Sequence, residues 1–464
     1  MNTTTRPRIS VRRPLTALTL ALLLGGCMSL APSYQTPAMA LPDSVALPES
    51  GAEVPRWWHR SGDPVLAGLI EEALAHNSNL LIAAARIEQA RAAFGIARAD
   101  QYPDAGLQLG ASRTRDPVQF PQIIQRFSAQ VLISYELDFW GKYRDASTAA
   151  REQLMASEAN REALRLSLAS AVAQTWYAFE ADTLRVALTE RTLAAQHEEL
   201  QLLRRRVGAG IAGEFELRQQ EAEVAGTTVA LQQHSGARDR GRHALGILLG
   251  RTPKALVNGE IPVGGDIVVM AVPATLPAEI PSDRLLGRPD VLAAEAGLKA
   301  ANAQIGVARA AWFPSLSLTA SGGGASGELS SLFSGGASAF SVGAAVLQPL
   351  LYGGRIAAGV DGAQAARNAA VETYRQAVSN AFREVLDALV ARRTAQEVSK
   401  AEAARVAALS ETLRLVRRRY DSGLIGQFEV LGTERNLLAA QGNLIEARRA
   451  EATAAVQVWT AIGG

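Results

Sequence analysis

Alternating apolar and polar side chains predict a β-hairpin in the first third of this chain. From Phe127 to Asp138 the two kinds of residue alternate at every position except Leu132, as in a strand with one apolar face. Residues 107–112 offer a partner strand, and the polar, proline-containing residues 113–122 are expected to form the loop between the two.

A second hairpin is expected at residues 316–321 and 340–346, joined by a Gly/Ser-rich loop at 322–338. It belongs to an internal repeat whose second copy follows the first by 211 to 213 positions. Solenoid repeats have periods of roughly 20–50 residues, so this is a duplicated half of one architecture. The repeated positions include Phe127 and Phe340, Gly141 and Gly354, Arg204–Arg206 and Arg417–Arg419, and Glu216 and Glu429.

Each hairpin is followed by a long stretch that predicts helix because it contains neither glycine nor proline. Lys142 to Val207 would reach ~99 Å and Ala363 to Ser422 ~90 Å, at 1.5 Å per residue. Glycine-containing turns end both, and returning helices are expected at Glu214–Leu249 and Gln427–Ile462. Helices of this length must pack lengthwise against similar helices.

Proline content and shorter periodic segments divide the rest of the chain. A short amphipathic helix is expected after Asp63-Pro64, and a second one at Asn79–Asp100, closed by Pro103. The predicted parts are residues 1–26, a signal peptide; 27–76, an extended tether and short helix; 77–250, the first repeat with its β-hairpin at 104–140; 251–283, a proline-rich linker; and 284–464, the second repeat with its β-hairpin at 314–353.

The N-terminal segment predicts export. Four arginines precede the apolar run Leu15–Leu24, which is shorter than the ~20 residues that span a bilayer. Cys27 is the only cysteine, so it has no partner for an intramolecular disulfide. Leu24-Gly25-Gly26-Cys27 resembles a bacterial lipobox, which implies cleavage before Cys27 and a covalent lipid on it. The alternative is an ordinary signal peptide followed by a free cysteine.

Net charge gives no indication of a nucleic-acid partner, and none is expected. Removing residues 1–26 removes four arginines and no acid, which changes the formal charge from +2 to −2. Aromatic residues are only 5% of the chain and it contains 40 glycines, a composition that favours long, closely packed helices over a compact enzyme.

Four amphipathic strands cannot close a barrel by themselves, and open strand edges are costly in a membrane. We expect the hairpins to lack partners within their own polypeptide and to pair with neighbouring subunits, so that three chains supply twelve strands. A soluble sheet with one wet face is the alternative. In the membrane interpretation the Ser, Gln and Gly residues of the strands face water. The residues expected to face lipid are Phe127, Val131, Ile133, Phe340, Val342 and Val346.

Several motifs together resemble the outer-membrane factors of tripartite efflux and secretion systems, in particular the TolC-like lipoproteins of the NodT type. They cover nearly the whole chain after the signal peptide. The motifs are Trp57-Trp58 with Gly62–Leu66, Tyr135–Lys142, Leu285–Val291, Ala301–Gly306, and Gln348–Leu350 with Gly353–Arg355. Ser61 departs from the pattern, because an aromatic residue is usual there, and Met28 implies sorting of the lipoprotein to the outer membrane.

The resemblance implies a fold and a function. The expected fold is a homotrimer in which a twelve-stranded transmembrane β-barrel continues into a periplasmic helical tunnel. The tunnel would be closed at its tip and opened by docking to a periplasmic adaptor and an inner-membrane pump. The protein would lie in the outer membrane of a Gram-negative bacterium and conduct substrates passively, without a cofactor or a metal.

The resemblance also places the closed aperture near Tyr420 and Glu429. The family's basic residue and second acid fall on Ile425 and Gly432, so fewer charged closing contacts are expected. The repeat adds Glu216 to the aperture, giving up to six carboxylates in a trimer, which would favour cations. The alternative for both glutamates is a helix-start acid stabilised by the macrodipole.

Two runs of three arginines lie at predicted helix C-termini, where the helix dipole favours cations. The sharper interpretation is that they contact the helical tips of the adaptor. The residues are Arg204, Arg205, Arg206, Arg417, Arg418 and Arg419.

Two other functional classes, an enzyme and a scaffold or adaptor, are alternatives to a channel. The five histidines show no metal-ligand spacing, there is no second cysteine, and Gly322-Gly323-Gly324 precedes no helix, so an enzyme is not expected. A periplasmic scaffold or adaptor lipoprotein without a pore is the remaining alternative. The exported substrate does not follow from the sequence.

Overall fold

The computed structural model describes residues 28–46, 57–60, 62–116, 120–259, 261 and 279–463. Cys27 and the predicted signal peptide lie outside the described residues. The chain forms two compact units, and each takes segments from both repeats. Unit 1 comprises residues 1–38, 86–157 and 293–375; unit 2 comprises residues 39–85, 158–292 and 376–464.

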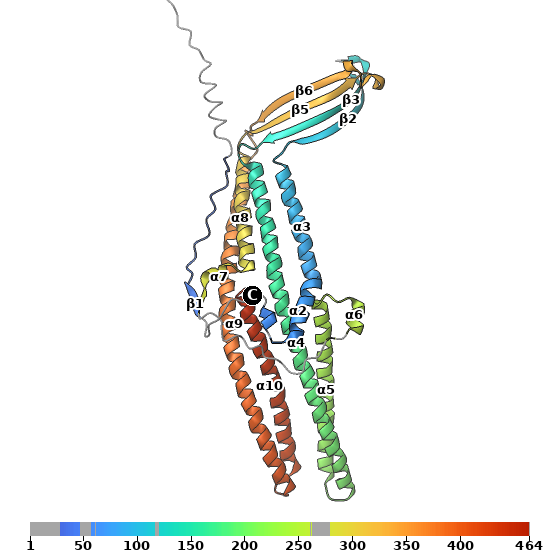
Figure 1. Ribbon diagram of the computed structural model, residues 1–464, viewed down its shortest axis with the longest axis vertical. Coiled ribbons are helices and arrows are strands. Elements are labelled where there is room, and N and C mark those ends of the chain that lie inside the picture. The colour runs from blue at the N-terminus through green and yellow to red at the C-terminus, as the bar shows by residue number, and fades with distance from the viewer. Residues whose placement is uncertain are drawn as a thin grey trace, which may run out of the picture. The chain divides into compact units, whose positions relative to one another are not determined.

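Unit 1 contains a four-stranded antiparallel sheet (Figure 1). Its strands are β2 (Asp104–Asp116), β3 (Phe120–Leu137), β5 (Ser315–Ser326) and β6 (Ser338–Leu347). Both predicted hairpins are confirmed, but residues 113–116, 120–122 and 322–326, expected in loops, belong to strands. The β5–β6 connection holds two short 3₁₀ turns, η2 (Leu329–Ser331) and η3 (Gly335–Ala337).

The expectation that the hairpins lack partners in their own chain is wrong. β3 pairs with β5, from Phe127 opposite Ser326 to Leu137 opposite Leu316, so the strand order is β2-β3-β5-β6. Period-two alternation identifies a strand but carries no information about which strand lies beside it. The outer edges of the described sheet are therefore β2 and β6.

The register places all six residues that were expected to face lipid on one face of the sheet. Paired residues in antiparallel strands point to the same side. Val131 lies opposite Gly322, which lies opposite Phe340, and Ile133 connects through Ala320 to Val342 in the same way. The other face carries rows such as Gln108–Gln130 and Ser321–Ser341. The sheet thus has one mainly apolar and one mainly polar face.

The helices agree closely with the predicted segments. They are α3 (Ser78–Ala99), α4 (Lys142–Gly208), α8 (Pro289–Ala310) and α9 (Arg355–Asp421). The predicted start of α9 at Ala363 is too late, because the helix also accommodates Gly359 and Gly362. Glycine lowers helix stability by only about 1 kcal/mol, which packing can offset.

The N-terminal segment of unit 1 is bound to α4 and α8 by polar contacts. Ser29 Oγ donates to Asp145 Oδ1 at 2.7 Å. Asn302 Nδ2 donates to the carbonyl of Pro32 at 2.7 Å, and Arg309 Nη1 donates to the carbonyl of Leu30 at 3.1 Å. Burial raises the pKa of Asp145, although the Ser29 hydroxyl opposes this shift. Within the predicted tether, residues 29–32 are therefore held against the helices by these contacts.

Unit 2 holds the returning helices α5 (Glu214–Leu248) and α10 (Gln427–Ala461) and a core built on tryptophans. Trp57 and Trp58, in η1 (Trp57–Arg60), and Trp176 are each 1% exposed. Asp63 caps α2 (Pro64–His76) and accepts a hydrogen bond from Trp176 Nε1 at 2.9 Å. The remaining elements are α6 (Pro253–Asn258), α7 (Ser282–Leu286), and β1 (Ser44–Ala46) paired with β4 (Glu279–Pro281).

Candidate functional site

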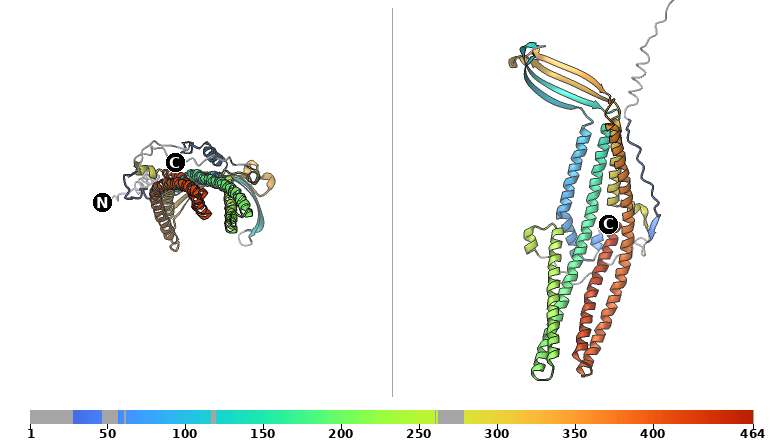
Figure 2. Two further views of the ribbon diagram at one scale, coloured as in Figure 1. Left: turned by 90° about the horizontal axis from the view of Figure 1, so that it is seen from below. Right: turned by 180° about the vertical axis from the view of Figure 1, so that it is seen from behind.

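The arginine runs lie at the tips of two helical hairpins in unit 2, α4–α5 and α9–α10 (Figure 2). The first arginine of each run is paired across its own hairpin. Arg204 Nη2 contacts Glu221 at 3.0 Å, and Arg417 Nη2 contacts Glu434 at 2.6 Å. Both pairs occupy equivalent positions of the repeat. The other four arginines, Arg205, Arg206, Arg418 and Arg419, are exposed.

Glu216 and Glu429 each occupy the third position after a helix N-cap glycine. A Cβ atom built on Gly213 would lie 2.4 Å from Glu216 Oε2, and one on Gly426 would lie 3.5 Å from Glu429 Oε2. Both carboxylates therefore lie against the positive end of a helix dipole, in the arrangement of the helix-start interpretation. Glu429 is exposed, and Glu216 is partly buried.

Tyr420 is half-buried and lines a groove of about 700 Å³ between the two hairpins. The groove is formed by α4, α5, α9 and α10, and Arg417 and Glu434 also line it. The structure thus brings Tyr420 together with one arginine of the second run. Glu216 and Glu429 do not line this groove.

Three polar contacts join the hairpins and were not predicted from the sequence. Gln427 Nε2 donates to Glu199 Oε1 at 3.3 Å, and Arg435 Nη1 lies 3.4 Å from Glu223 Oε1. Neither pair is repeated between the halves, so the internal repeat gave no signal for them. Burial raises the pKa of Glu199, and the nearby carboxylate of Glu434 adds to the shift.

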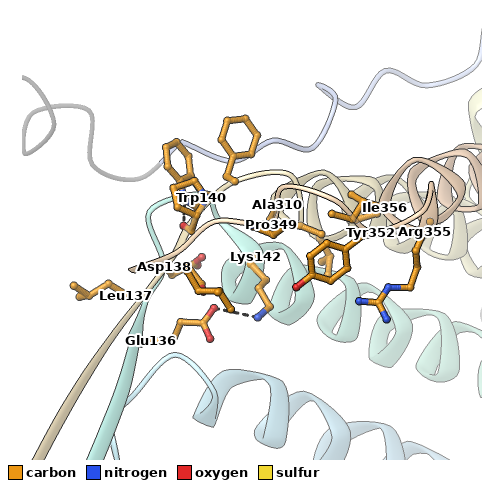
Figure 3. A pocket seen from close by; sticks show the side chains of 18 residues that line it. Glu136, Leu137, Asp138, Trp140, Lys142, Ala310, Pro349, Tyr352, Arg355 and Ile356 are labelled. Atoms are coloured by element: carbon orange, nitrogen blue, oxygen red, sulfur yellow. Dashed lines mark hydrogen bonds and ion pairs between the residues drawn. The ribbon is translucent and has the colours of Figure 1, made fainter. Parts of the chain in front are cut away.

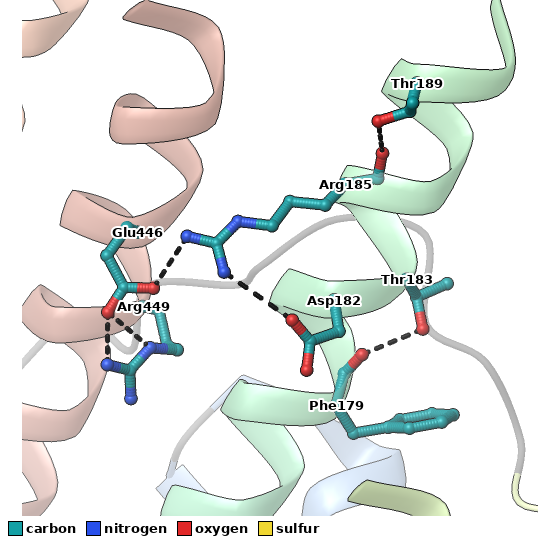
Figure 4. Close-up of polar contacts among 7 residues, drawn as sticks. All are labelled: Phe179, Asp182, Thr183, Arg185, Thr189, Glu446 and Arg449. Carbon is teal, nitrogen blue, oxygen red and sulfur yellow. Dashed lines mark hydrogen bonds and ion pairs between the residues drawn. The ribbon is translucent and has the colours of Figure 1, made fainter. Parts of the chain in front are cut away.

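The third contact is a network of charges centred on Glu446 (Figure 4). Arg185 Nη2 from α4 contacts Glu446 Oε2 at 3.1 Å, and Arg449 Nε donates to Glu446 Oε1 at 2.9 Å. Arg185 also lies 3.5 Å from Asp182. Burial acts to raise the pKa of Glu446, but the two arginines outweigh it and hold the pKa below its ordinary value. Glu446 therefore stays ionised and links α4 to α10.

Residues of the motifs Tyr135–Lys142 and Gln348–Leu350 with Gly353–Arg355 line a pocket of about 370 Å³ in unit 1 (Figure 3). Lys142 and Arg355, which are equivalent in the repeat, both face it. Lys142 Nζ lies 3.1 Å from Glu136 Oε1, and Arg355 lies over the Tyr352 ring at 4.8 Å. Trp140 Nε1 donates to the carbonyl of Pro314 at 2.8 Å. These contacts fix the connections between sheet and helices.

The motif Leu285–Val291 contains a buried arginine. Arg288 donates to Asp290, to Glu384 at 2.7 Å, and to the carbonyl of Ala461 at 2.6 Å. It thereby links the start of α8 to α9 and to the end of α10 within unit 2. The partners satisfy a charge whose burial would otherwise be costly.

Two further properties concern only the described part of the chain. None of its helices combines the length and the apolar character needed to cross a membrane. Its histidine, aspartate and glutamate side chains form no group of three or more that could hold a metal ion.

A sheet with one apolar exposed face, joined in sequence to two long helical hairpins, is an arrangement expected of an outer-membrane transport channel. The model of the outer membrane efflux protein family matches residues 69–251 and 280–464. The chain therefore belongs to the outer membrane efflux protein family.

Known proteins agree over nearly the full length. The probable efflux pump outer membrane protein TtgC of Pseudomonas putida is 35% identical over 459 residues, covering 96% of this chain and 94% of that protein. The probable outer membrane lipoprotein SilC of Salmonella typhimurium is 31% identical, covering 97% and 98%. The crystal structure of the Campylobacter jejuni CmeC outer membrane channel has a TM-score of 0.88 and 26% identity, covering 94% and 95%.

These findings confirm the predicted class and location. The protein is the outer-membrane component of an efflux system and lies in the outer membrane. The alternative of a scaffold or adaptor without a pore is not supported. Members of this family are transporters rather than enzymes.

Proposed function

We propose that three copies of this chain close a twelve-stranded barrel in the outer membrane and continue into a helical tunnel through the periplasm. The tunnel passively conducts substrates delivered by an inner-membrane pump and a periplasmic adaptor. Tyr420, Glu429 and Glu216 lie at its periplasmic aperture, where up to six carboxylates favour cations.

The observation that carries this proposal is the two-faced sheet with two outer edges. Phe340 and Val342 on the apolar face are 87% and 81% exposed in the single chain. Such a surface is stable in lipid only when the edges β2 and β6 are paired, and pairing them between chains satisfies both.

Conductance tests this function. We expect the purified protein to run as a heat- and detergent-resistant trimer and to give stepwise conductance in a planar lipid bilayer. A monomer that stays soluble without detergent and conducts no ions would contradict the proposal and favour a scaffold.

We also propose that Cys27 carries the lipid anchor, which the motif Leu24–Cys27 supports. Cys27→Ser is expected to leave the signal peptide uncleaved by lipoprotein processing and to remove the acyl mass. Intact-protein mass spectrometry of membrane fractions measures both, with Ser29→Ala as the control that keeps the cysteine. An unchanged acylated mass in Cys27→Ser would exclude this site.

The exposed arginines at the hairpin tips are proposed to contact the adaptor. Reversal of Arg205, Arg206, Arg418 and Arg419 to Glu is expected to abolish export because like charges then repel an acidic partner surface. The measurement is cellular efflux together with crosslinking to the adaptor, at unchanged trimer yield.

The chain supplies a matched control in the paired arginines. Reversal of Arg204 and Arg417 places carboxylates beside Glu221 and Glu434, so it is expected to loosen the tips themselves and to lower trimer yield. Full export by the variant with all four exposed arginines reversed would end the proposed adaptor contact.

A further inference from the structure

Gln427 has a buried acceptor without a donor. Its side chain is 7% exposed, and Nε2 donates to Glu199 Oε1 at 3.3 Å. Oε1 of the same amide is buried and accepts no hydrogen bond within the described part of the chain. A buried carbonyl oxygen without a donor loses the hydrogen bond that water would give it. The contact between the hairpins is therefore incomplete while Glu199 is ionised.

The charges around Glu199 come from both hairpins. From α10 it faces the carboxylate of Glu434, and from α9 the guanidinium of Arg417; Arg206 acts from its own helix. Burial is the main cause that raises the pKa of Glu199, and Glu434 reinforces it, whereas Arg417, Gln427 and Arg206 oppose the shift. The other ionisable residues that line the same groove are Arg191, Glu198, Glu223, Tyr420, Asp421 and Arg435.

We propose that Glu199 and Gln427 form a proton-dependent clasp, which holds the two helical hairpins of unit 2 together when Glu199 is neutral and weakens when it ionises. The consequence for channel opening rests on the proposed function, but the clasp itself does not.

Hydrogen-bond chemistry explains why protonation of Glu199 strengthens the clasp. A neutral carboxyl group carries an O–H donor, which a carboxylate lacks. The proton taken up by Glu199 lets the carboxyl donate to Gln427 Oε1 while Gln427 Nε2 donates to the other carboxyl oxygen, so two hydrogen bonds replace one. Protonation also removes the repulsion between Glu199 and Glu434. The carboxyl O–H bond forms with a proton taken from solvent, and no other covalent bond changes.

The sign of the pH dependence follows from linkage. With the hairpins apart, Glu199 is in water at its ordinary pKa, whereas the closed contact raises that pKa. The closed form therefore binds the proton more tightly, and falling pH favours closure. Rising pH loosens the clasp, over a range that begins above the ordinary carboxyl pKa.

Distances between the tips test the proposal in the purified full-length protein. Spin labels on Ala209→Cys and Ser422→Cys, which are exposed and equivalent in the repeat, report the separation by pulsed electron resonance in spin-diluted trimers. Between about pH 8 and about pH 5 the ratio of close to separated tips should rise, by up to about tenfold for each unit by which closure raises the pKa.

Four variants distinguish protonation of Glu199 in the clasp from other effects of low pH on the protein. Glu199→Gln, which stays neutral and keeps both a donor and an acceptor, should hold the tips close at every pH. Gln427→Leu should abolish the response with the tips apart. Glu434→Gln, which removes the repelling carboxylate, should shift the transition to lower pH. Glu198→Gln, in the same groove, should leave the response unchanged.

Two results would overturn the clasp: a wild-type distance that does not change with pH, or a Glu199→Gln variant that keeps the wild-type response. If Glu199→Gln failed to assemble, the shift in Glu434→Gln would decide in its place. Bilayer conductance is recorded separately. Tips that respond to pH in a protein that conducts no ions would refute the channel and leave the clasp standing.

Discussion

The substitution Val342→Arg is expected to abolish the membrane-inserted trimer. Val342 lies near the middle of β6, on the apolar face of the sheet, and is 81% exposed in the single chain. An arginine on the lipid face near the bilayer midplane costs about 2–4 kcal/mol, and a trimer contains three copies. Heat-stable trimer in the outer-membrane fraction of Val342→Arg should fall below detection.

The neighbouring residue provides the matched control. Ser341 is adjacent in the same strand but points to the polar face, where its Oγ lies 2.9 Å from Ser321 Oγ. Ser341→Arg is expected to assemble normally and to reduce conductance for cations, since it adds a positive charge to the water-filled side. Equal trimer yields for the two variants would show that the apolar face does not meet lipid.

Gly250→Ala is expected to destabilise unit 2 strongly. Gly250 ends α5 with φ of 71°, a conformation that costs a non-glycine residue roughly 1–2 kcal/mol. In addition, a Cβ there would lie 2.2 Å from the carbonyl oxygen of His76, which is backbone and cannot rotate away. We expect a loss of about 3 kcal/mol or more, followed as the thermal loss of helical circular dichroism in detergent.

Gly463 is the equivalent position of the second repeat. A variant there separates the cost of the backbone conformation from the cost of the contact with His76. Its φ of 96° is also positive, but a Cβ there would meet only the side chain of Arg288, at an ordinary contact distance of 3.4 Å. Gly463→Ala should therefore cost roughly 1–2 kcal/mol, the conformational part alone. If Gly250→Ala and Gly463→Ala melted at the same temperature, contact with His76 would not be the cause.

The sequence was sufficient to predict the helices and strands and to predict which strand residues share a face. Helix bounds agree within a few residues except at the start of α9, where Gly359 and Gly362 lie inside the helix. The alternation from Phe127 to Asp138 correctly placed Val131 and Ile133 on one face. The motifs after residue 69 all lie in a family-model match, and Trp57, Trp58 and Leu66 of the first motif lie in the buried core.

At the candidate site the sequence was less informative. The repeat identified the arginine runs, but it did not reveal that Arg204 and Arg417 are paired with Glu221 and Glu434, seventeen positions further on. The Glu199–Gln427 contact was missed because its two residues are 228 positions apart and have no counterpart in the other half.

Local periodicity and residue identity are enough to locate the helices and strands, the apolar strand positions and the internal duplication. The pairing of β3 with β5, and the contacts of α4 with α10 through Arg185 and Glu199, are visible only in the folded chain. Strand pairing and contacts between helices depend on which surfaces meet in space, and residues hundreds of positions apart carry no local pattern that specifies this.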